Sequence, residues 1–243
     1  MKIVCTIEAR MKSSRLPGKV LLPVCGKPLL ELMIERLRQV PELGGIVIAT
    51  TADPSCQPIE DLARRLGVGC FRGSEDDVLD RVLRAAQSAD ADLIVETTGD
   101  CPLLDPDIVS QVIREFQSRD VDYCANVLDR TFPRGMDVQV FPTNVLARVA
   151  ELTNNPSDRE HVSIYIYTHP ERFRLHNVPS QLAPEDADLR LTVDTPDDFK
   201  LVTEIFERLY PANPRFRLAD ILRLMREHPE LRVINSHIRQ KAT

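Results

Sequence analysis

The chain has 243 residues, of which 43% are hydrophobic and 28% are charged, so it can bury a full core as one large or two small domains. Its formal net charge of -6 argues against broad nucleic-acid binding, which normally requires a basic face. No apolar run approaches the length of a membrane span, and residues 3–7 are too short for a signal peptide, so we expect a cytoplasmic protein without membrane contact. The six cysteines form no C-x-x-C pair, which indicates reduced thiols rather than a zinc site or a disulfide framework.

Strand and helix patterns alternate over the first half of the chain. Short runs rich in valine and isoleucine predict strands over residues 2–7, 45–51, 69–71 and 92–97. Apolar residues at helical spacing predict helices over residues 28–40, 56–66 and 75–88, the last with Ser74 as its N-cap. Asp105 followed by Pro106 predicts a capped helix through Phe116. This alternation indicates a parallel sheet with right-handed crossovers, whose ligand crevice lies beyond the carboxyl ends of the strands.

The organisation changes after about residue 120. The patterns predict strands over residues 121–124, 136–141, 173–178 and 189–193, and helices over residues 144–152, 158–168, 196–209 and 218–226. At the start of the second of these helices, residues 157–160 (SDRE) have the spacing of a capping box, which gives Glu160 a structural role. We predict one α/β domain over residues 1–243 with an inserted arm at about residues 126–184. The arm would cover the crevice or pair with a second subunit.

A basic loop follows the first predicted strand. Residues 10–19 (RMKSSRLPGK) contain four cations, two serines and a Pro-Gly turn within an otherwise acidic chain. Such a loop at the carboxyl end of a buried strand suits a polyanion, and a nucleoside triphosphate is the polyanion that fits best. A solvated surface loop is the alternative. Neither G-x-x-x-x-G-K-[ST] nor G-x-G-x-x-G is present, which argues against the P-loop and dinucleotide-binding folds.

Two aspartates follow predicted strands and are candidate ligands for a divalent cation. Asp100 lies in residues 94–103 (IVETTGDCPL), and Asp194 lies in residues 191–198 (LTVDTPDD). Strand-end carboxylates in one crevice can share Mg²⁺ on a nucleotide phosphate. Each aspartate also has a structural alternative, because Asp100 can cap a turn before Pro102 and the segment after Asp194 can cap the next helix.

Five segments together resemble the cytidylyltransferases that activate sugar acids, which include the 3-deoxy-manno-octulosonate and acylneuraminate enzymes. The segments are residues 9–10 (AR), 14–19 (SRLPGK), 26–29 (GKPL), 99–103 (GDCPL) and 193–199 (VDTPDDF). Residues 71–79 (FRGSEDDVL), 132–137 (FPRGMD) and 158–162 (DREHV) look most like the branch named after a spore-coat polysaccharide biosynthesis protein. The resemblance extends from residue 1 to about residue 210. It implies a glycosyltransferase-A-like (Rossmann-like) fold with a mixed, mainly parallel sheet and helices on both faces, and usually a homodimer.

The same resemblance implies transfer of CMP from CTP to a sugar acid, with release of pyrophosphate, in cell-surface polysaccharide or glycoconjugate biosynthesis. The triphosphate would be bound by Arg10, Ser14, Arg15 and Lys19. Mg²⁺ would be held by Asp100 and Asp194, and the residues expected to act in catalysis are Arg10, Lys19 and Asp100. The octulosonate enzymes carry an acidic residue where this chain has Cys101, which predicts a different metal shell or sugar contact at that position.

The nucleoside and the acceptor have separate candidate residues. Arg72, Gly73 and Ser74 follow the third predicted strand, where the related enzymes contact the nucleoside; the alternative is a surface Arg72 and a capping Ser74. In the predicted arm, the candidates for acceptor binding are Arg134, Asp137, Arg159 and His161. Because arginine binds a carboxylate through two parallel hydrogen bonds, we expect an acidic sugar as acceptor, with its anion on Arg134. A packed or surface histidine is the alternative for His161.

Two other functions remain open at this point. A glycosyltransferase of the same fold normally has an Asp-x-Asp metal motif after the fourth strand, and here Asp100 is followed by Cys101 and Pro102. A nucleotide-binding protein without catalytic activity is the second alternative, because a fold can persist when its activity is lost. The sequence does not decide between cytosine and guanine, nor does it identify the acceptor sugar.

Overall fold

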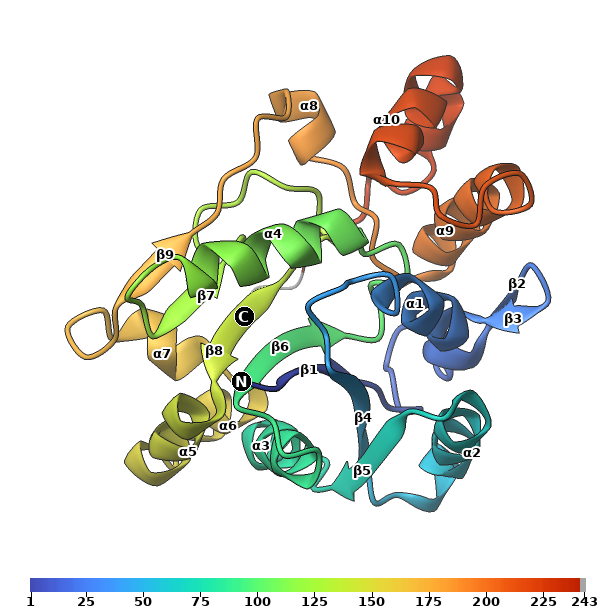
Figure 1. Cartoon of the computed structure of the whole chain (residues 1–243). Helices are drawn as coiled ribbons and strands as arrows, with labels where there is room; N and C mark the ends of the chain where they lie inside the picture. The colour runs from blue at the N-terminus through green and yellow to red at the C-terminus, as the bar shows by residue number, and fades with distance from the viewer. Residues whose placement is uncertain (241–243) are drawn as a thin grey trace.

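A mixed sheet of seven strands, in the order β5-β4-β1-β6-β8-β7-β9, forms the centre of residues 1–240, the part of the chain that the computed structural model describes (Figure 1). The strands are β1 (Ile3–Glu8), β4 (Gly45–Thr51), β5 (Gly69–Gly73), β6 (Leu93–Thr98), β7 (Tyr123–Ala125), β8 (Gln139–Pro142) and β9 (Leu175–Asn177). Only β8 runs against its neighbours among these strands, β6 and β7. A short ribbon of β2 (Pro23–Val24) and β3 (Lys27–Pro28) lies outside the sheet. The predicted mixed, mainly parallel α/β fold is confirmed.

Helices follow most strands of the described region. They are α1 (Leu29–Leu37), α2 (Gln57–Leu66), α3 (Val78–Ser88), α4 (Pro106–Gln117), α5 (Thr143–Leu152), α6 (Pro156–Glu160), α7 (Ile164–Thr168), α8 (Pro184–Ala187), α9 (Pro196–Leu209) and α10 (Leu218–Glu227). Three short 3-10 helices are η1 (Lys19–Leu21), η2 (Pro54–Cys56) and η3 (Pro229–Val233). Asp105 caps α4 by accepting from the backbone of Asp107, as its sequence predicts. None of the helices in residues 1–240 is both long and apolar enough to cross a bilayer.

The helices cover both faces of the sheet (Figure 1). Along β1, Ile3, Cys5 and Ile7 pack in one apolar layer with residues of α1, α2, α4, α9 and α10. Val4 points to the opposite layer, which contains residues of α3, α5 and α7. Because side chains alternate along a strand, Thr6 and Glu8 continue the Val4 face toward the carboxyl end of β1. The apolar face thus gives way to polar side chains at the edge where a ligand is expected.

The strand predicted over residues 189–193 is wrong. Residues 189–193 make only an isolated parallel bridge between Arg134 and Arg190. The following backbone turns to another partner, because the Val193 N–H donates to the Asp100 carbonyl at 2.7 Å. This path requires Gly135, whose φ is +99° and where a Cβ atom would lie 2.6 Å from the Leu191 carbonyl carbon.

One predicted helix is split in two, and two helices are capped by residues other than those predicted. Residues 158–168 form α6 and α7, separated at Val162, which has a φ of +48° and a buried side chain. Residue Asn155 caps α6, so the capping box predicted at residues 157–160 is wrong. Helix α3 is capped by Asp77 and not by Ser74, whose hydroxyl accepts from the Asp77 N–H one turn earlier. Residues 126–184, predicted as an arm, contribute β8 and β9 to the sheet and α5, α6 and α7 beside it.

Candidate active site

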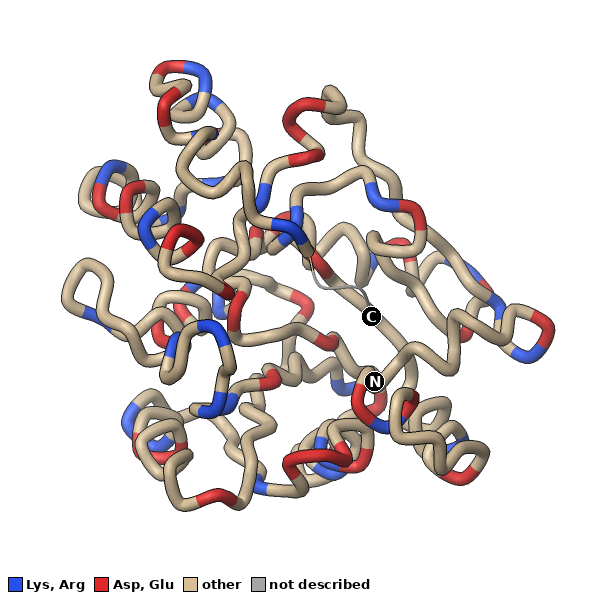
Figure 2. The backbone as a smooth tube through the Cα atoms, turned by 180° about the vertical axis from the view of Figure 1, so that it is seen from behind, with Lys and Arg blue, Asp and Glu red and all other residues tan. Residues whose placement is uncertain are grey.

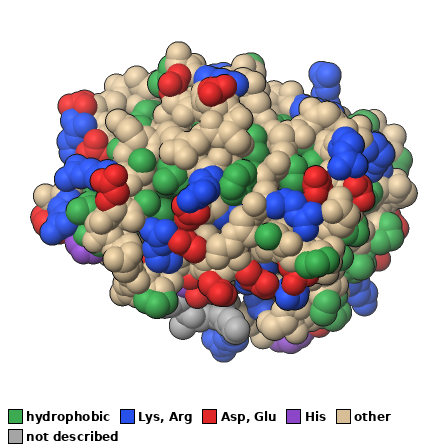
Figure 3. Space-filling model, turned by 90° about the horizontal axis from the view of Figure 1, so that it is seen from below, with side chains coloured by type: hydrophobic (Ala, Val, Ile, Leu, Met, Phe, Trp, Pro, Cys, Tyr) green, Lys and Arg blue, Asp and Glu red, His purple; other side chains and the backbone are tan. Residues whose placement is uncertain are grey.

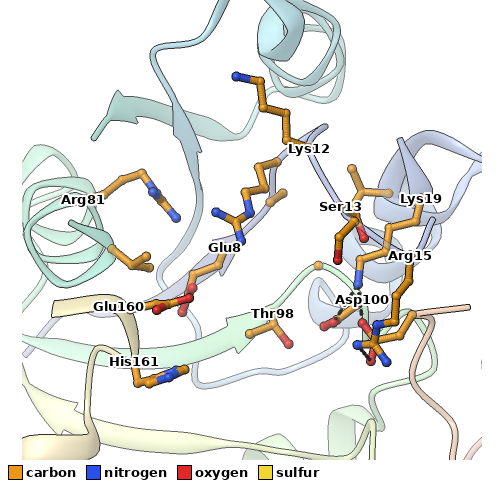
Figure 4. A pocket seen from close by; sticks show the side chains of 17 residues that line it. Glu8, Lys12, Ser13, Arg15, Lys19, Arg81, Thr98, Asp100, Glu160 and His161 are labelled. Carbon is orange, nitrogen blue, oxygen red and sulfur yellow. Dashed lines mark hydrogen bonds and ion pairs between the residues drawn. The ribbon is translucent and has the colours of Figure 1, made fainter. Parts of the chain in front are cut away.

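A cavity of about 400 Å³ lies at the carboxyl ends of β1 and β6 (Figure 4). Of the residues predicted from the sequence, it brings together Arg10, Ser14, Arg15, Lys19, Asp100, Asp194 and His161. Figure 4 shows Lys19, Arg15 and Asp100 at one end of the cavity and Arg81, Glu160 and His161 at the other. The basic loop and both aspartates therefore form one site, although they are far apart in the sequence.

Lys19 joins the two aspartates. Its ammonium donates to Asp100 Oδ2 at 3.0 Å and to Asp194 Oδ1 at 2.8 Å, and its side chain is only 12% exposed. Burial alone would lower the pKa of Lys19, but the charges of Asp100 and Asp194 raise it above its ordinary value. Lys19 is therefore a cation near neutral pH, and it lies between two carboxylates in one small space.

Asp194 is held by two further cations. Arg190 donates to its Oδ2 at 2.7 Å, and Arg15 lies 3.1 Å from the same oxygen. Burial alone would raise the pKa of Asp194, but Lys19, Arg15 and Arg190 hold it below its ordinary value. The helix cap after Asp194 is made by others, since Thr195 and Asp198 form the capping box of α9. The segment after Asp194 thus caps the helix as the alternative predicted, and the Asp194 carboxylate itself is not part of the cap.

The loop between β1 and η1 is fixed at both ends. The Gly18 N–H donates to the Met11 carbonyl at 2.8 Å, which closes the loop. Gly18 has a φ of +70°, and the Lys19 N–H donates to the Leu16 carbonyl at 3.3 Å, which closes the Pro-Gly turn. Lys12 lies 2.5 Å from Asp53 and 3.5 Å from Glu75, which ties the loop to the segments after β4 and β5.

In Figure 2, basic and acidic segments from different parts of the chain lie close together near the middle of the molecule. Acidic and basic side chains also intermingle on the face that Figure 3 shows.

The three residues predicted to contact the nucleoside lie just outside the cavity wall. Arg72 donates to the carbonyls of Thr51, Ala52 and Asp53, and its Nη1 lies 2.9 Å from Glu60 Oε2. These bonds hold the turn after β4. Gly73 packs closely on α3, because a Cβ atom there would lie 3.1 Å from Arg81 Cγ. Ser74 makes the backbone bond described above, so a nucleoside contact of these residues stays a prediction.

A second cavity, of about 840 Å³, adjoins the first. Thr98, the last residue of β6, lines both of them. Arg134 and Asp137, both predicted to bind the acceptor, line the second cavity together with Arg130. Arg130 forms two parallel bonds with Asp137, at 2.6 and 3.0 Å. Within residues 1–240 no carboxylate pairs with the Arg134 guanidinium, so Asp137 positions Arg130 and Arg134 remains available for an anion.

The last two candidates from the predicted arm lie on α6 and just after it. Arg159 pairs with Asp77 and donates to the Ala150 carbonyl at 3.0 Å, so its guanidinium links α6 to α3 and α5. It lines a third cavity of about 470 Å³, which shares Arg10 and Glu160 with the first. His161 lines the first cavity and not the one that holds Arg134.

Sequence reasoning missed Glu8, Glu96 and Arg81. Glu8 and Arg81 line the first cavity, and Glu96 lines the second. Burial raises the pKa of Glu8 to about 7, against the opposing effect of Arg81, and burial raises the pKa of Glu96 well above its ordinary value. A signal was present in the sequence, because Glu96 interrupts a run that predicts a buried strand.

Comparisons with known proteins give the chain a family. The cytidylyltransferase family model matches residues 4–228. An uncharacterised protein of Methanocaldococcus jannaschii is 35% identical over 100% of this chain and 98% of its own length. The spore coat polysaccharide biosynthesis protein SpsF of Bacillus subtilis is 29% identical over 94% of this chain and 95% of its own.

Solved structures agree with this result. A cytidylyltransferase from Leptospira borgpetersenii superposes with a TM-score of 0.90 at 31% identity, covering 100% of this chain and 99% of its own. A CTP complex of CMP-2-keto-3-deoxy-manno-octonic acid synthetase has the same fold, with a TM-score of 0.64 at 21% identity over 86% of this chain and 99% of its own. The chain therefore belongs to the cytidylyltransferase family of nucleotidyltransferases.

Proposed function

We propose that this chain transfers CMP from CTP to a hydroxyl group of an acidic sugar and releases pyrophosphate. One observation carries the proposal: a cavity lined by the basic loop meets, at Thr98, a second cavity lined by Arg134, whose guanidinium pairs with no carboxylate among residues 1–240. Two anions can therefore bind on either side of one residue. A triphosphate and the carboxylate of a sugar acid are such a pair.

The cations that line the first cavity differ in how closely they are already paired with carboxylates. Arg15 and Lys19 lie beside Asp100 and Asp194, whereas Arg10 is 45% exposed and 4.0 Å from its nearest carboxylate, Glu75. Arg10 is thus the loop cation with least competition for a phosphate oxygen. Alignment of the attacking and leaving oxygens and neutralisation of their charge are the main requirements of such a transfer.

Mg²⁺ fits the pair of aspartates. Both carboxylates lie within 3.0 Å of the Lys19 ammonium, so they are close enough to act on one cation, and they offer the hard oxygen ligands that Mg²⁺ prefers. When bound, the metal would neutralise charge on the phosphates. Asp100 and Asp194 would hold it.

The acceptor would lie in the second cavity, with its carboxylate on Arg134. Burial and the charge of Arg130 lower the pKa of Arg134, which means that an anion there relieves repulsion between two guanidiniums. Names of relatives support an acidic sugar: a 3-deoxy-manno-octulosonate cytidylyltransferase of Trichlorobacter lovleyi is 34% identical over 48% of this chain and 45% of its own length. The CTP of the complex named above supports the choice of nucleotide.

The decisive experiment measures pyrophosphate release by the pure protein with Mg²⁺ and each of the four nucleoside triphosphates. Each triphosphate is paired with a panel of sugar acids and with neutral sugars of the same size. We expect release with CTP and at least one sugar acid, and a CMP-sugar product by mass spectrometry. Equal turnover of the neutral sugars would refute the acidic acceptor, and release in no combination would refute the transfer itself.

A further inference from the structure

Two adjacent carboxyl groups, the half-buried Glu8 and the buried Glu96, lie near the junction of the two cavities. Glu8 is the last residue of β1, and its register partner on β6 is Thr98. Thr98 is the residue common to both cavities. Figure 4 shows the Glu8 side chain on the side of the first cavity that also holds Arg81, Glu160 and His161. Glu8 thus lines the first cavity beside the residue that also lines the second.

Glu96 lies next to Glu8 on the same face of the sheet. Its register partner on β1 is Thr6, two residues before Glu8, so the two glutamates lie diagonally across neighbouring strands. Glu96 is only 4% exposed, and its side chain lines the second cavity. The two carboxyl groups are close enough that each shifts the pKa of the other, and a proton shared between them would join them by a hydrogen bond. Within the described residues the Oε2 atom of Glu96 is buried without a hydrogen-bond partner.

Charged and titratable groups from several elements surround Glu8 and Glu96. Arg81 on α3 and Arg10 in the basic loop favour the anion of Glu8, whereas Asp100 after β6 opposes it. Glu160 and His161, from α6 and the residue after it, line the same cavity. On the far side, Tyr123 of β7 and Tyr167 of α7 lie near Glu96, and both have raised pKa values because of burial and the Glu96 charge.

These surroundings decide which carboxyl holds the proton. Burial raises the pKa of both groups, but the pKa of Glu8, at about 7, stays lower because Arg81 and the hydrogen bond from Glu96 favour its anion. Near neutral pH, therefore, Glu96 is the protonated donor and Glu8 is close to its midpoint. A base with a pKa near the working pH combines an available anion with a useful drive for proton transfer.

A purely structural reading of the pair is weak. Burying carboxyl groups costs free energy, and apolar side chains of similar size would stabilise the sheet better. Arg81 does not form an ion pair with either glutamate in the described residues. Its Nη1 donates to the carbonyls of Ser74 and Glu75, and its Nε is buried without a hydrogen-bond partner among those residues. Such incomplete pairing in a cavity wall indicates that a ligand group completes it.

We propose that Glu8 is the general base that takes the proton of the acceptor hydroxyl, and that Glu96 is the positioning residue that holds the Glu8 carboxylate through its hydrogen bond. The inference rests on the proposed transfer. As the acceptor O–H bond breaks, its proton goes to Glu8 and its oxygen forms a bond to the α-phosphorus of CTP. The bond from that phosphorus to the bridging oxygen breaks, and pyrophosphate leaves with the electron pair. Water then removes the proton from Glu8.

Three substitutions test the two roles through the pH dependence of kcat. Glu8→Gln removes the base and should lower kcat by about 10²–10⁴-fold, with the Kd for CTP changed less than about twofold. Glu96→Gln keeps a neutral donor and should retain kcat and its pH profile. Glu96→Leu removes the donor, so the acidic limb of the profile should move to higher pH. Glu31→Gln is the matched control, since Glu31 is a buried glutamate (7% exposed) of α1 that pairs with Arg65 away from both cavities.

The outcomes separate this inference from the function on which it rests. If the parent releases no pyrophosphate with any acceptor, the proposed function fails and the base role falls with it. If the parent is active but Glu8→Gln keeps its kcat or its acidic limb, the base role alone is wrong. Equal losses of kcat in Glu96→Gln and Glu96→Leu would overturn the positioning role.

A measurement without any acceptor tests the shared proton itself. Infrared difference spectra report protonated carboxyl groups. At a pH above the midpoint of Glu8, the parent should still show the protonated carboxyl group of Glu96, and Glu96→Gln should lack it. Addition of CTP should shift this band, because the triphosphate changes the charge beside Glu8. Absence of a protonated carboxyl group from the parent near pH 7 would overturn the assignment whatever the activity.

Discussion

Replacement of Asp194 with asparagine tests the charge network at the triphosphate end of the first cavity. The Asp194 carboxylate lies 2.8 Å from Lys19 and 2.7 Å from Arg190, and its side chain is 12% exposed. Arg15 is a third cation, at 3.1 Å. Asparagine keeps the shape but removes the charge that these cations share. Loss of one partner of a buried ion pair costs about 3–5 kcal/mol.

The low end of that range applies here, because each of the two closest cations keeps another carboxylate: Asp100 for Lys19 and Asp198 for Arg190. We therefore expect the free energy of unfolding to fall by about 3 kcal/mol and Tm by roughly 6–12 °C in a chain of this length. Asp197→Asn is the control, since Asp197 lies on the same turn but is 48% exposed. Its effect should stay below about 1 kcal/mol.

The pH dependence gives the sign of the effect. A carboxyl group whose pKa is lowered on folding contributes stability above its unfolded pKa of about 3.9, and this contribution is lost as the pH falls through the folded value. The pKa of Asp194 is lowered in the folded chain. Urea unfolding should therefore show the full difference between the parent and Asp194→Asn at pH 7, and a smaller one below about pH 4. The reasoning is refuted if Asp194→Asn costs no more than Asp197→Asn at pH 7, or if the difference persists in acid.

Four further substitutions separate the roles of the other site residues. Arg10→Ala and Arg15→Ala should each lower kcat/KM for CTP by about 10- to 100-fold with a much smaller effect on Tm, and normal turnover would show that the triphosphate binds elsewhere. Asp100→Asn should raise the Mg²⁺ concentration needed for half-maximal rate, and should lower Tm less than Asp194→Asn because Lys19 is its single cationic partner in the described residues; an unchanged Mg²⁺ requirement would contradict a metal role. Arg134→Lys should raise the KM for the acceptor and leave the KM for CTP nearly unchanged, because lysine keeps the charge but cannot form two parallel hydrogen bonds with a carboxylate. An equal rise in both KM values would contradict acceptor binding by Arg134.

The elements that the sequence predicts well are those whose signals are local. Strand β4 and helix α9 begin and end where the apolar patterns do, and the caps Asp105 and Thr195 are read from adjacent residues. The basic loop and Asp100 are local signals as well, and parallel strands bring their carboxyl ends to one edge. The association of these residues in one cavity follows from that rule. Asp194 follows no strand and is placed there by the bond of Val193 to the Asp100 carbonyl.

The features that the sequence does not predict depend on partners distant in the chain. The segment 189–193 has the apolar pattern of a strand, but its backbone bonds to Arg134 and Asp100 from two different loops. The break at Val162 buries one side chain and has no glycine or proline to announce it. The pairing of Glu8 with Glu96 depends on the register of β1 against β6, and a shift of one residue would place the carboxyl groups on opposite faces.

The position of Lys19 between two carboxylates leads to a last prediction, about metal and nucleotide together. In this structure the ammonium neutralises Asp100 and Asp194, so it competes with any cation that these aspartates would bind. Lys19→Met removes the competitor and leaves two adjacent carboxylates with less counter-charge. Mg²⁺ should then bind more tightly without nucleotide, by calorimetric titration, than it binds to the parent.

The same substitution should weaken the coupling between metal and CTP. In the parent, Asp100 and Asp194 bound to a divalent cation would hold Lys19 less strongly and leave its ammonium to bond a phosphate oxygen, so Mg²⁺ should raise the affinity for CTP. Lys19→Met has no ammonium to release, and its CTP affinity should depend less on Mg²⁺. Glu31→Gln again serves as the control. If Lys19→Met binds Mg²⁺ no more tightly than the parent, the two aspartates do not form the metal pair, and Lys19 links them for stability alone.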